Sequence, residues 1–217
     1  MKELLEQRIV SLDDLKIDSD NEVISVNTSP YRLPLRRKDF PDEKFFNKFV
    51  KKCKSIVRSS TEYNDWREYL GEVLNSYNCS ITGEESYKTT IEIHHHPYSL
   101  ETIVKCVIKS YLIKEMPFST FDICSDIIKL HYDNKIGFIP LVASLHEKFH
   151  NGYLELPMEL VKGNYLQFHH DYSKYLDEED QSTINNRFSV NKENCGWVVL
   201  NWVKNGTDNS ERSSEER

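Results

Sequence analysis

Two stretches of sequence decide the expected fold: "IEIHHHP" at residues 91–97 and "IPLVASLHEKFHNG" at residues 139–152. In the first, apolar and polar residues alternate with the period of two that is typical of a half-buried strand. In the second, an apolar run leads into His146 and His150, which are four residues apart and therefore lie on one face of a helix. The Asn-Gly pair that follows is a typical helix stop. The sequence thus predicts a strand end and a helix that both present histidines.

Histidines in this arrangement suit metal-assisted hydrolysis. Cutting a phosphodiester requires a base that activates water and a cation that stabilises the developing charge. Imidazole can act as the base or as a ligand of the cation. A strand end with adjacent histidines and a helix with two more can bring three nitrogens to one metal and leave a fourth free. The candidate set is His94, His95, His146 and His150.

The two stretches resemble the two motifs of the HNH endonucleases, also called the His-Me finger or ββα-metal family. "CSITG" at residues 79–83 stands where many members carry C-x-x-C-G, so the resemblance covers residues 79–152, about a third of the chain. It implies a ββα-metal core that hydrolyses DNA, with His95 as the general base. It also implies one divalent cation, held by His94, His146 and His150. Zinc, nickel or manganese suits these ligands better than magnesium, which prefers oxygen.

One departure from the family concerns structural zinc. Many members hold zinc with two C-x-x-C pairs, whereas the matching positions here are Cys79 with Thr82 and Val142 with Leu145. We therefore expect no structural zinc, and apolar packing in its place.

A second departure concerns the asparagine that gives the family its middle letter and orients the base. This residue would fall near Gly137, and the nearest candidate, Asn134, lies three residues earlier. We take Asn134 as the candidate orienting residue for His95.

Periodicity indicates an α+β chain, and the resemblance implies that its core is a ββα-metal HNH core with additional helices on both sides. The 217 residues suffice for one domain with extensions or for two small ones. We expect four parts: an N-terminal arm and basic helical region (1–76), the HNH core (77–152), a C-terminal extension (153–203) and a disordered tail (204–217). Local patterns predict a β-hairpin that turns near Gly83 and ends at Pro97, and a strand-like "YLQFHHDY" at residues 165–172. They also predict a helix capped by Asp42, helices at about 61–76, 99–114 and 119–132, and an acidic helix before Val190.

Charge is distributed unevenly along the chain. The net charge of -7 argues against a protein that coats nucleic acid indiscriminately. Residues 32–58, however, are rich in lysine and arginine, and we expect this segment to contact DNA phosphates. The acidic C-terminal region, with "DEED" at residues 177–180, is a candidate surface for a protein partner. The expected phosphate contacts are Arg36, Arg37, Lys51 and Lys52.

The sequence also bears on the compartment. The five cysteines are scattered and form no C-x-x-C pair, no apolar run is long enough to span a membrane, and charges interrupt the N-terminal "MKELLEQRIV". We therefore expect free thiols, no membrane partner and a cytoplasmic protein. The composition, rich in Lys, Asn and Tyr around an HNH module, resembles that of bacteriophage proteins. A phage origin would place the chain in the host cytoplasm.

Two other functions are open at this stage. "HEKFH" at residues 146–150 also satisfies H-E-x-x-H, in which Glu147 would be the base of a zinc metalloprotease, but this interpretation leaves "IEIHHHP" unexplained. The other alternative keeps the HNH fold without its chemistry, as a binding or assembly subunit. The missing asparagine and the net acidity favour that alternative, and the presence of all four histidines disfavours it.

Overall fold

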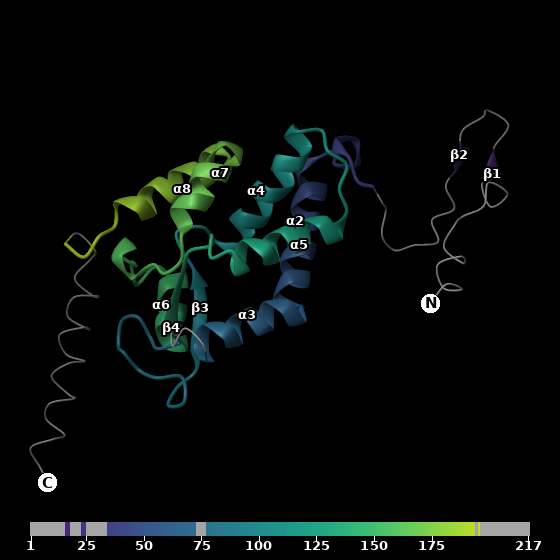
Figure 1. Cartoon of the computed structure of the whole chain (residues 1–217). Helices are drawn as coiled ribbons and strands as arrows, with labels where there is room; N and C mark the ends of the chain where they lie inside the picture. The colour runs from purple at the N-terminus through teal and green to yellow at the C-terminus, as the bar shows by residue number, and fades with distance from the viewer. Residues whose placement is uncertain (1–15, 18–22, 25–33, 73–76, 194, 196–217) are drawn as a thin grey trace, which may run out of the picture.

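Helices make up most of the described chain, and a small antiparallel sheet lies among them (Figure 1). The structure, a computed structural model, describes residues 16–17, 23–24, 34–72, 77–193 and 195. The α+β class expected from the sequence is confirmed. The helices are α2 (Glu43–Ser59), α3 (Thr61–Glu72), α4 (Leu100–Ile113), α5 (Thr120–Tyr132), α6 (Ala143–His150), α7 (Tyr165–Tyr172) and α8 (Glu178–Ser189). The strands are β1 (Lys16–Ile17), β2 (Val23–Ile24), β3 (Ile91–His95) and β4 (Phe138–Val142), and short 3-10 turns occupy Arg37–Asp39, Met158–Leu160 and Ser173–Tyr175.

The predicted helix starts are confirmed by their capping bonds. The side chain of Asp42 accepts a hydrogen bond from the backbone N–H of Phe45 and so begins α2. Ser119 and Asp122 form a reciprocal capping box at the start of α5. These bonds satisfy backbone N–H groups that the first turn of a helix would otherwise leave without partners.

The pairing of β3 with β4 differs from the local hairpin that the sequence predicts. The two strands run antiparallel, from Ile91 opposite Val142 to His95 opposite Phe138, and α4 and α5 lie between them in the sequence. The expected hairpin partner upstream of β3 is wrong, because the segment around Gly83 forms turns in which the N–H of Gly83 donates to the carbonyl of Cys79. Strand β3 therefore finds its partner far along the chain.

The segment "YLQFHHDY" is helix α7, so the expected strand there is wrong. Its aromatic residues follow the helical period: Phe168 and Tyr172, four residues apart, stack with ring centroids 4.7 Å apart. Phe168 is buried in the main core. Packing on one helical face thus outweighs the alternation that suggests a strand.

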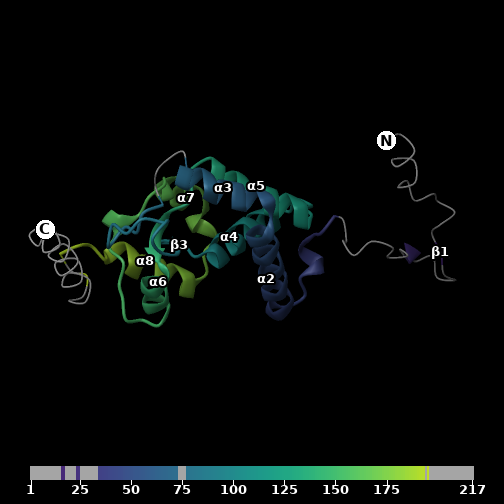
Figure 2. The same ribbon diagram turned by 90° about the horizontal axis from the view of Figure 1, so that it is seen from below.

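Two hydrophobic clusters hold the elements together. The larger lies among α2, α3, α4, α5, α7 and α8, with α4 in the middle of the helices in Figure 2. The smaller lies beneath the sheet and α6, and it includes Cys79, Ile139, Leu145 and Leu156. Helix α6 begins directly after β4 and packs against both strands. The sheet therefore lies between the two clusters and fixes α6 over one of its faces.

Gly137, just before β4, lies at a very close approach of two chain segments. A Cβ atom at this position would lie 2.1 Å from the carbonyl oxygen of His96 and 2.8 Å from the Cβ of Tyr165. The N–H of His96 donates to the carbonyl of Gly137 at 3.0 Å. An asparagine side chain, which the family resemblance would put near this position, has no room here.

Parts of the expected organisation fall outside the described residues. The tail predicted at residues 204–217 and most of the N-terminal arm are among them. In the described part of the chain, β1 and β2 pair antiparallel within the arm. None of the helices described is long and apolar enough to span a bilayer.

Candidate metal centre

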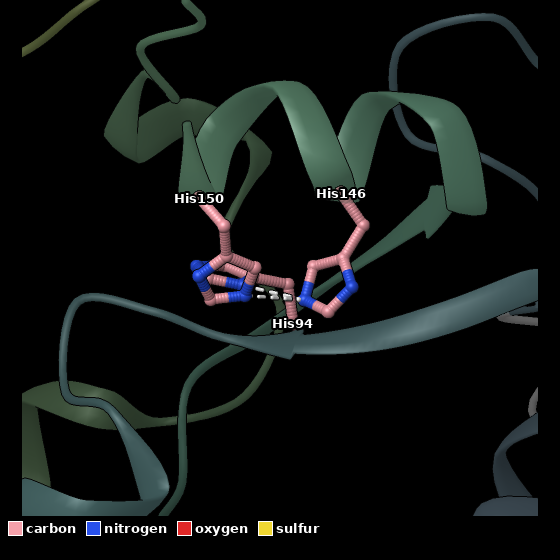
Figure 3. Close-up of side chains that lie close together, drawn as sticks. All are labelled: His94, His146 and His150. Carbon is pink, nitrogen blue, oxygen red and sulfur yellow. Dashed lines mark hydrogen bonds between the residues drawn. The ribbon is translucent and has the colours of Figure 1, made fainter. Parts of the chain in front are cut away.

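Three of the four predicted histidines meet between β3 and α6 (Figure 3). The Nε2 atom of His146 lies 3.1 Å from Nδ1 of His94 and 3.0 Å from Nε2 of His150. His94 is buried, His146 is partly buried and His150 is exposed. The centre is therefore closed on the strand side and open to solvent beside His150.

Glu92 fixes the orientation of the His146 ring. This residue lies two positions before His94 on β3, and its carboxylate accepts a hydrogen bond from Nδ1 of His146. Because Nδ1 of His146 carries the proton, the lone pair of its Nε2 points at the other two rings. A carboxylate that holds the far nitrogen of an imidazole is the usual partner of a metal-ligating histidine.

The geometry and the donor set fit a divalent cation. Two nitrogens that each lie about 2.0–2.1 Å from one ion would be roughly 3.0–3.4 Å apart in octahedral or tetrahedral coordination. The two short nitrogen distances, 3.1 and 3.0 Å, lie in this range. The Nε2 lone pair of His146 can accept a hydrogen bond from one of the two neighbouring nitrogens, which leaves the other without a partner. A cation between the rings would instead bind one nitrogen of each histidine. Imidazole ligands suit zinc, nickel or manganese.

Burial lowers the pKa of two of these rings, His94 and His150. Burial, together with the neighbouring histidines, lowers the pKa of His94 to about 2. Burial also lowers the pKa of His150, and the charges of His146, Arg187 and Arg58 act in the same direction. A metal ligand must be deprotonated, so the lowered pKa values favour metal binding over protonation.

The comparisons with known proteins identify the family. A family model described as Bacteriophage G278-like virion protein matches residues 1–206. The chain belongs to this family of phage virion proteins. The match covers the basic helix α2 as well as the histidines of β3 and α6. The expected phage origin is confirmed.

The other comparisons found no relatives. No curated protein and no solved structure matches this virion protein significantly. The resemblance to HNH endonucleases therefore stays a prediction.

His95, the predicted general base, lies on the opposite face of β3 from His94. It is 5% exposed, and its ring is stacked over Tyr63 and Trp66 of α3, with centroids 6.3 and 6.5 Å away. Its Nε2 lies 3.0 Å from Nε2 of His131. Its base role stays a prediction, and contact with a substrate would require His95 to leave His131.

His131 of α5 is the buried partner that sequence reasoning missed. Its Nδ1 donates to the carbonyl of Ile127, so its Nε2 accepts the hydrogen bond from His95. Burial lowers the pKa of His131 to about 4, and burial also lowers the pKa of His95 well below its usual value. The pair is therefore neutral at physiological pH and joins β3 to the helical core.

The other predicted site residues lie apart from the three histidines. Asn134 is exposed in the turn after α5, with a backbone φ of 56°, and its carbonyl accepts from the N–H of Asn164. A left-handed asparagine is common just after a helix. The structure gives it no contact with His95, and its orienting role stays a prediction. The predicted phosphate contacts Arg36, Arg37, Lys51 and Lys52 are exposed on α2 and on the turn before it.

Two carboxylates of the acidic C-terminal region form ion pairs with lysines of the same chain. Asp180 forms an ion pair with Lys105 at 3.1 Å, and Asp177 forms one with Lys109 at 3.2 Å. These pairs connect the start of α8 to α4. The expectation that this region binds a protein partner stays a prediction.

Metal binding should depend on Glu92. Glu92→Gln should weaken binding of zinc, nickel and manganese by roughly 10- to 100-fold, the usual cost of losing the hydrogen-bonding partner of a ligating histidine. His146→Ala, which removes a ligand, should abolish binding at micromolar concentrations. Glu147→Gln is the matched control, because Glu147 is exposed on α6 next to His146. Isothermal titration calorimetry measures all three variants, and equal affinity of Glu92→Gln and wild type would contradict the role of Glu92.

The folded state should lose stability in acid through His131. Its pKa is about 4 in the folded chain and about 6.5 when unfolded, so the unfolded state binds more protons between these values. The contribution of His131 is complete above pH 6.5 and is lost as pH falls toward 4, by about 3 kcal/mol. Urea unfolding at several pH values should show that His131→Gln reduces the slope of stability against pH by about one proton. His170→Gln, at a side chain that is 82% exposed, should leave the slope unchanged, and an unchanged slope in His131→Gln would contradict the assignment.

Proposed function

We propose that this virion protein is a metal-dependent endonuclease of the HNH kind, which hydrolyses DNA phosphodiester bonds with one divalent cation. The observation that carries the proposal is the meeting of His94, His146 and His150, with Glu92 behind His146. Strand β3 and helix α6 supply these side chains, and the chain order of β3, β4 and α6, with α4 and α5 inserted between the strands, supports the resemblance to a ββα-metal core.

The chemistry of the centre suits a phosphodiester. A divalent cation among the three imidazoles would stabilise the negative charge that develops on the phosphoryl group. The residues of the chain hold the ligands in place: β3 buries His94, and Glu92 fixes the tautomer of His146. His150 lies on the exposed side, where a substrate as large as DNA can approach. An H-E-x-x-H metalloprotease also needs a third zinc ligand, and His94 would fill that place, so the three histidines fit both functions. The basic face of α2 favours the nuclease.

The basic face of α2 supports nucleic acid as the substrate. Two shallow grooves along this helix share Lys51, and one of them ends at Arg58. The charge of Arg58 is also among those that lower the pKa of His150. The grooves are lined by Lys44, Asn47, Lys48, Lys51, Lys54, Ser55, Arg58, Ser59 and one acidic residue, Glu43.

A second candidate function is a metal-binding assembly subunit of the virion without nuclease activity. Two observations favour it: His95 is buried against His131, and Gly137 leaves no room for an orienting asparagine. Membership of a virion protein family is compatible with both candidates.

A nicking assay separates the two candidates. With manganese, nickel, magnesium or zinc, the wild type should convert supercoiled plasmid to the nicked form. His150→Ala should lose metal binding and lower the nicking rate by roughly a hundredfold or more, because the cation supplies several kcal/mol of charge stabilisation. His170→Ala is the control, since it removes an exposed histidine from α7.

The pattern of results decides between the candidates. Metal binding without nicking by the wild type, across all four ions, would refute the endonuclease and favour the assembly subunit. A folded His95→Ala variant that keeps its metal affinity but loses nicking would support His95 as the base.

The four predicted phosphate contacts, on α2 and on the turn before it, should contribute to DNA affinity through phosphates alone. A variant with alanine at Arg36, Arg37, Lys51 and Lys52 should bind all DNA sequences more weakly, and the dependence of its affinity on salt should be flatter. A Lys109→Ala/Lys174→Ala variant, which removes cations from other elements, is the control. Fluorescence anisotropy over a range of salt concentrations measures both variants. Unchanged affinity and salt slope in the four-fold variant would mean that these four residues do not bind DNA.

A further inference from the structure

His96 is the histidine for which the sequence suggests no role, and it lies beside the metal centre. It directly follows β3, and its ring centroid lies 5.9 Å from that of His94. His96 is 1% exposed, and neither of its ring nitrogens has a hydrogen-bond partner among the described residues. A neutral imidazole always carries one N–H, and leaving a buried donor without a partner costs roughly 1–3 kcal/mol. The position of His96 therefore requires an explanation.

Arg187 of α8 reaches the same place from another part of the chain. Its Nη1 donates to the carbonyl of Pro97 at 2.5 Å, and its Cζ lies 5.8 Å from the ring centroid of Phe149. The same Phe149 ring lies 4.3 Å from the ring of His94 and 5.9 Å from that of His96. The ring of Phe149 thus lies next to Arg187 as well as to both histidines.

The guanidinium of Arg187 has donors to spare. It carries five N–H donors, and within the described parts of the chain no carboxylate lies at ion-pair distance from it. Its charge lowers the pKa of both His96 and His150, which agrees with a position close to both rings. A partly buried cation with spare donors beside a metal centre is suited to an anion, because charge-assisted hydrogen bonds to phosphate are strong and geometrically specific.

We propose that Arg187 and His96 form an anion subsite beside the metal centre, which holds a non-bridging oxygen of a phosphodiester. The inference rests on the proposed function, because it places the phosphate next to the cation held by His94, His146 and His150. Arg187 supplies two N–H donors, and His96 supplies the N–H that is otherwise without a partner. The subsite would fix one phosphate in register with the cation, while the basic face of α2 contacts the rest of the nucleic acid.

The test uses a probe too small to reach α2: a thymidine dinucleotide with a single phosphodiester, titrated into the zinc-loaded protein. NMR signals of the His96 and His150 rings follow the binding. Arg187→Gln should weaken dinucleotide binding by at least about tenfold, the expected loss for a charged hydrogen bond, while zinc affinity stays the same. Glutamine can still donate to the carbonyl of Pro97, so the fold should be kept, as thermal unfolding will check. Arg187→Lys should bind with intermediate affinity.

Lys174→Gln is the matched control, because Lys174 is also a cation over an aromatic ring, 5.2 Å from the centroid of Tyr175. It should bind the dinucleotide as the wild type does. Inorganic phosphate, titrated in parallel, shows whether the subsite prefers a diester or a free phosphate.

The outcomes separate this inference from the proposed function. If the wild type binds zinc but Arg187→Gln binds the dinucleotide equally well, or if the wild type does not bind it at millimolar concentration, the subsite is refuted and the metal centre stands. If the wild type binds no metal, the proposed function fails, and the same titration on the metal-free protein still tests Arg187.

Discussion

The alternation of side chains along β3 is the constraint on which the rest of the structure depends. Successive residues of a strand point to opposite faces of the sheet. Glu92 and His94 therefore face α6, where both contact His146, whereas His95 points into the helical core. A shift of one residue in the pairing of β3 would exchange these two sets and dismantle the centre. The register, from Ile91 opposite Val142 onward, thus decides which side chains of β3 meet the histidines of α6.

Two features keep this register in place. On the core side, His95 and His131 are hydrogen-bonded to each other and pack among aromatic rings. One of these rings belongs to Trp66, and its centroid lies 4.7 Å from that of His131. At the strand end, Gly137 allows the backbone of His96 to approach so closely that any side chain would clash. Glycine here costs backbone entropy but permits a contact that no other residue can make. The structure therefore uses this position for packing, whereas the HNH resemblance predicts an asparagine near it.

Features governed by neighbours in the sequence could be predicted, and features governed by distant contacts could not. The caps at Asp42 and Ser119 and the i, i+4 pair His146 and His150 depend on a few adjacent residues, and they lie where the sequence puts them. The spacing of Glu92 and His94 on one strand face was a usable signal for the partner of His146. The sequence pattern predicts a strand where α7 lies, because the packing of Phe168, a tertiary contact, decides the conformation there. Arg187 has no signal in the sequence, because α8 comes close to Phe149 only through tertiary contacts.

The fold itself brings His94, His146 and His150 together. Burial keeps His94 neutral down to a pKa of about 2, so the folded chain resists a proton that the unfolded chain accepts near pH 6.5. The sign follows: stability falls as pH drops below 6.5, because the unfolded state then binds more protons. A cation that binds only the folded chain raises the free energy of unfolding, by an amount that increases with the cation concentration relative to Kd. The buried histidines thus lower the stability of the folded chain in acid. A cation bound where the three imidazole nitrogens converge would offset this loss of stability.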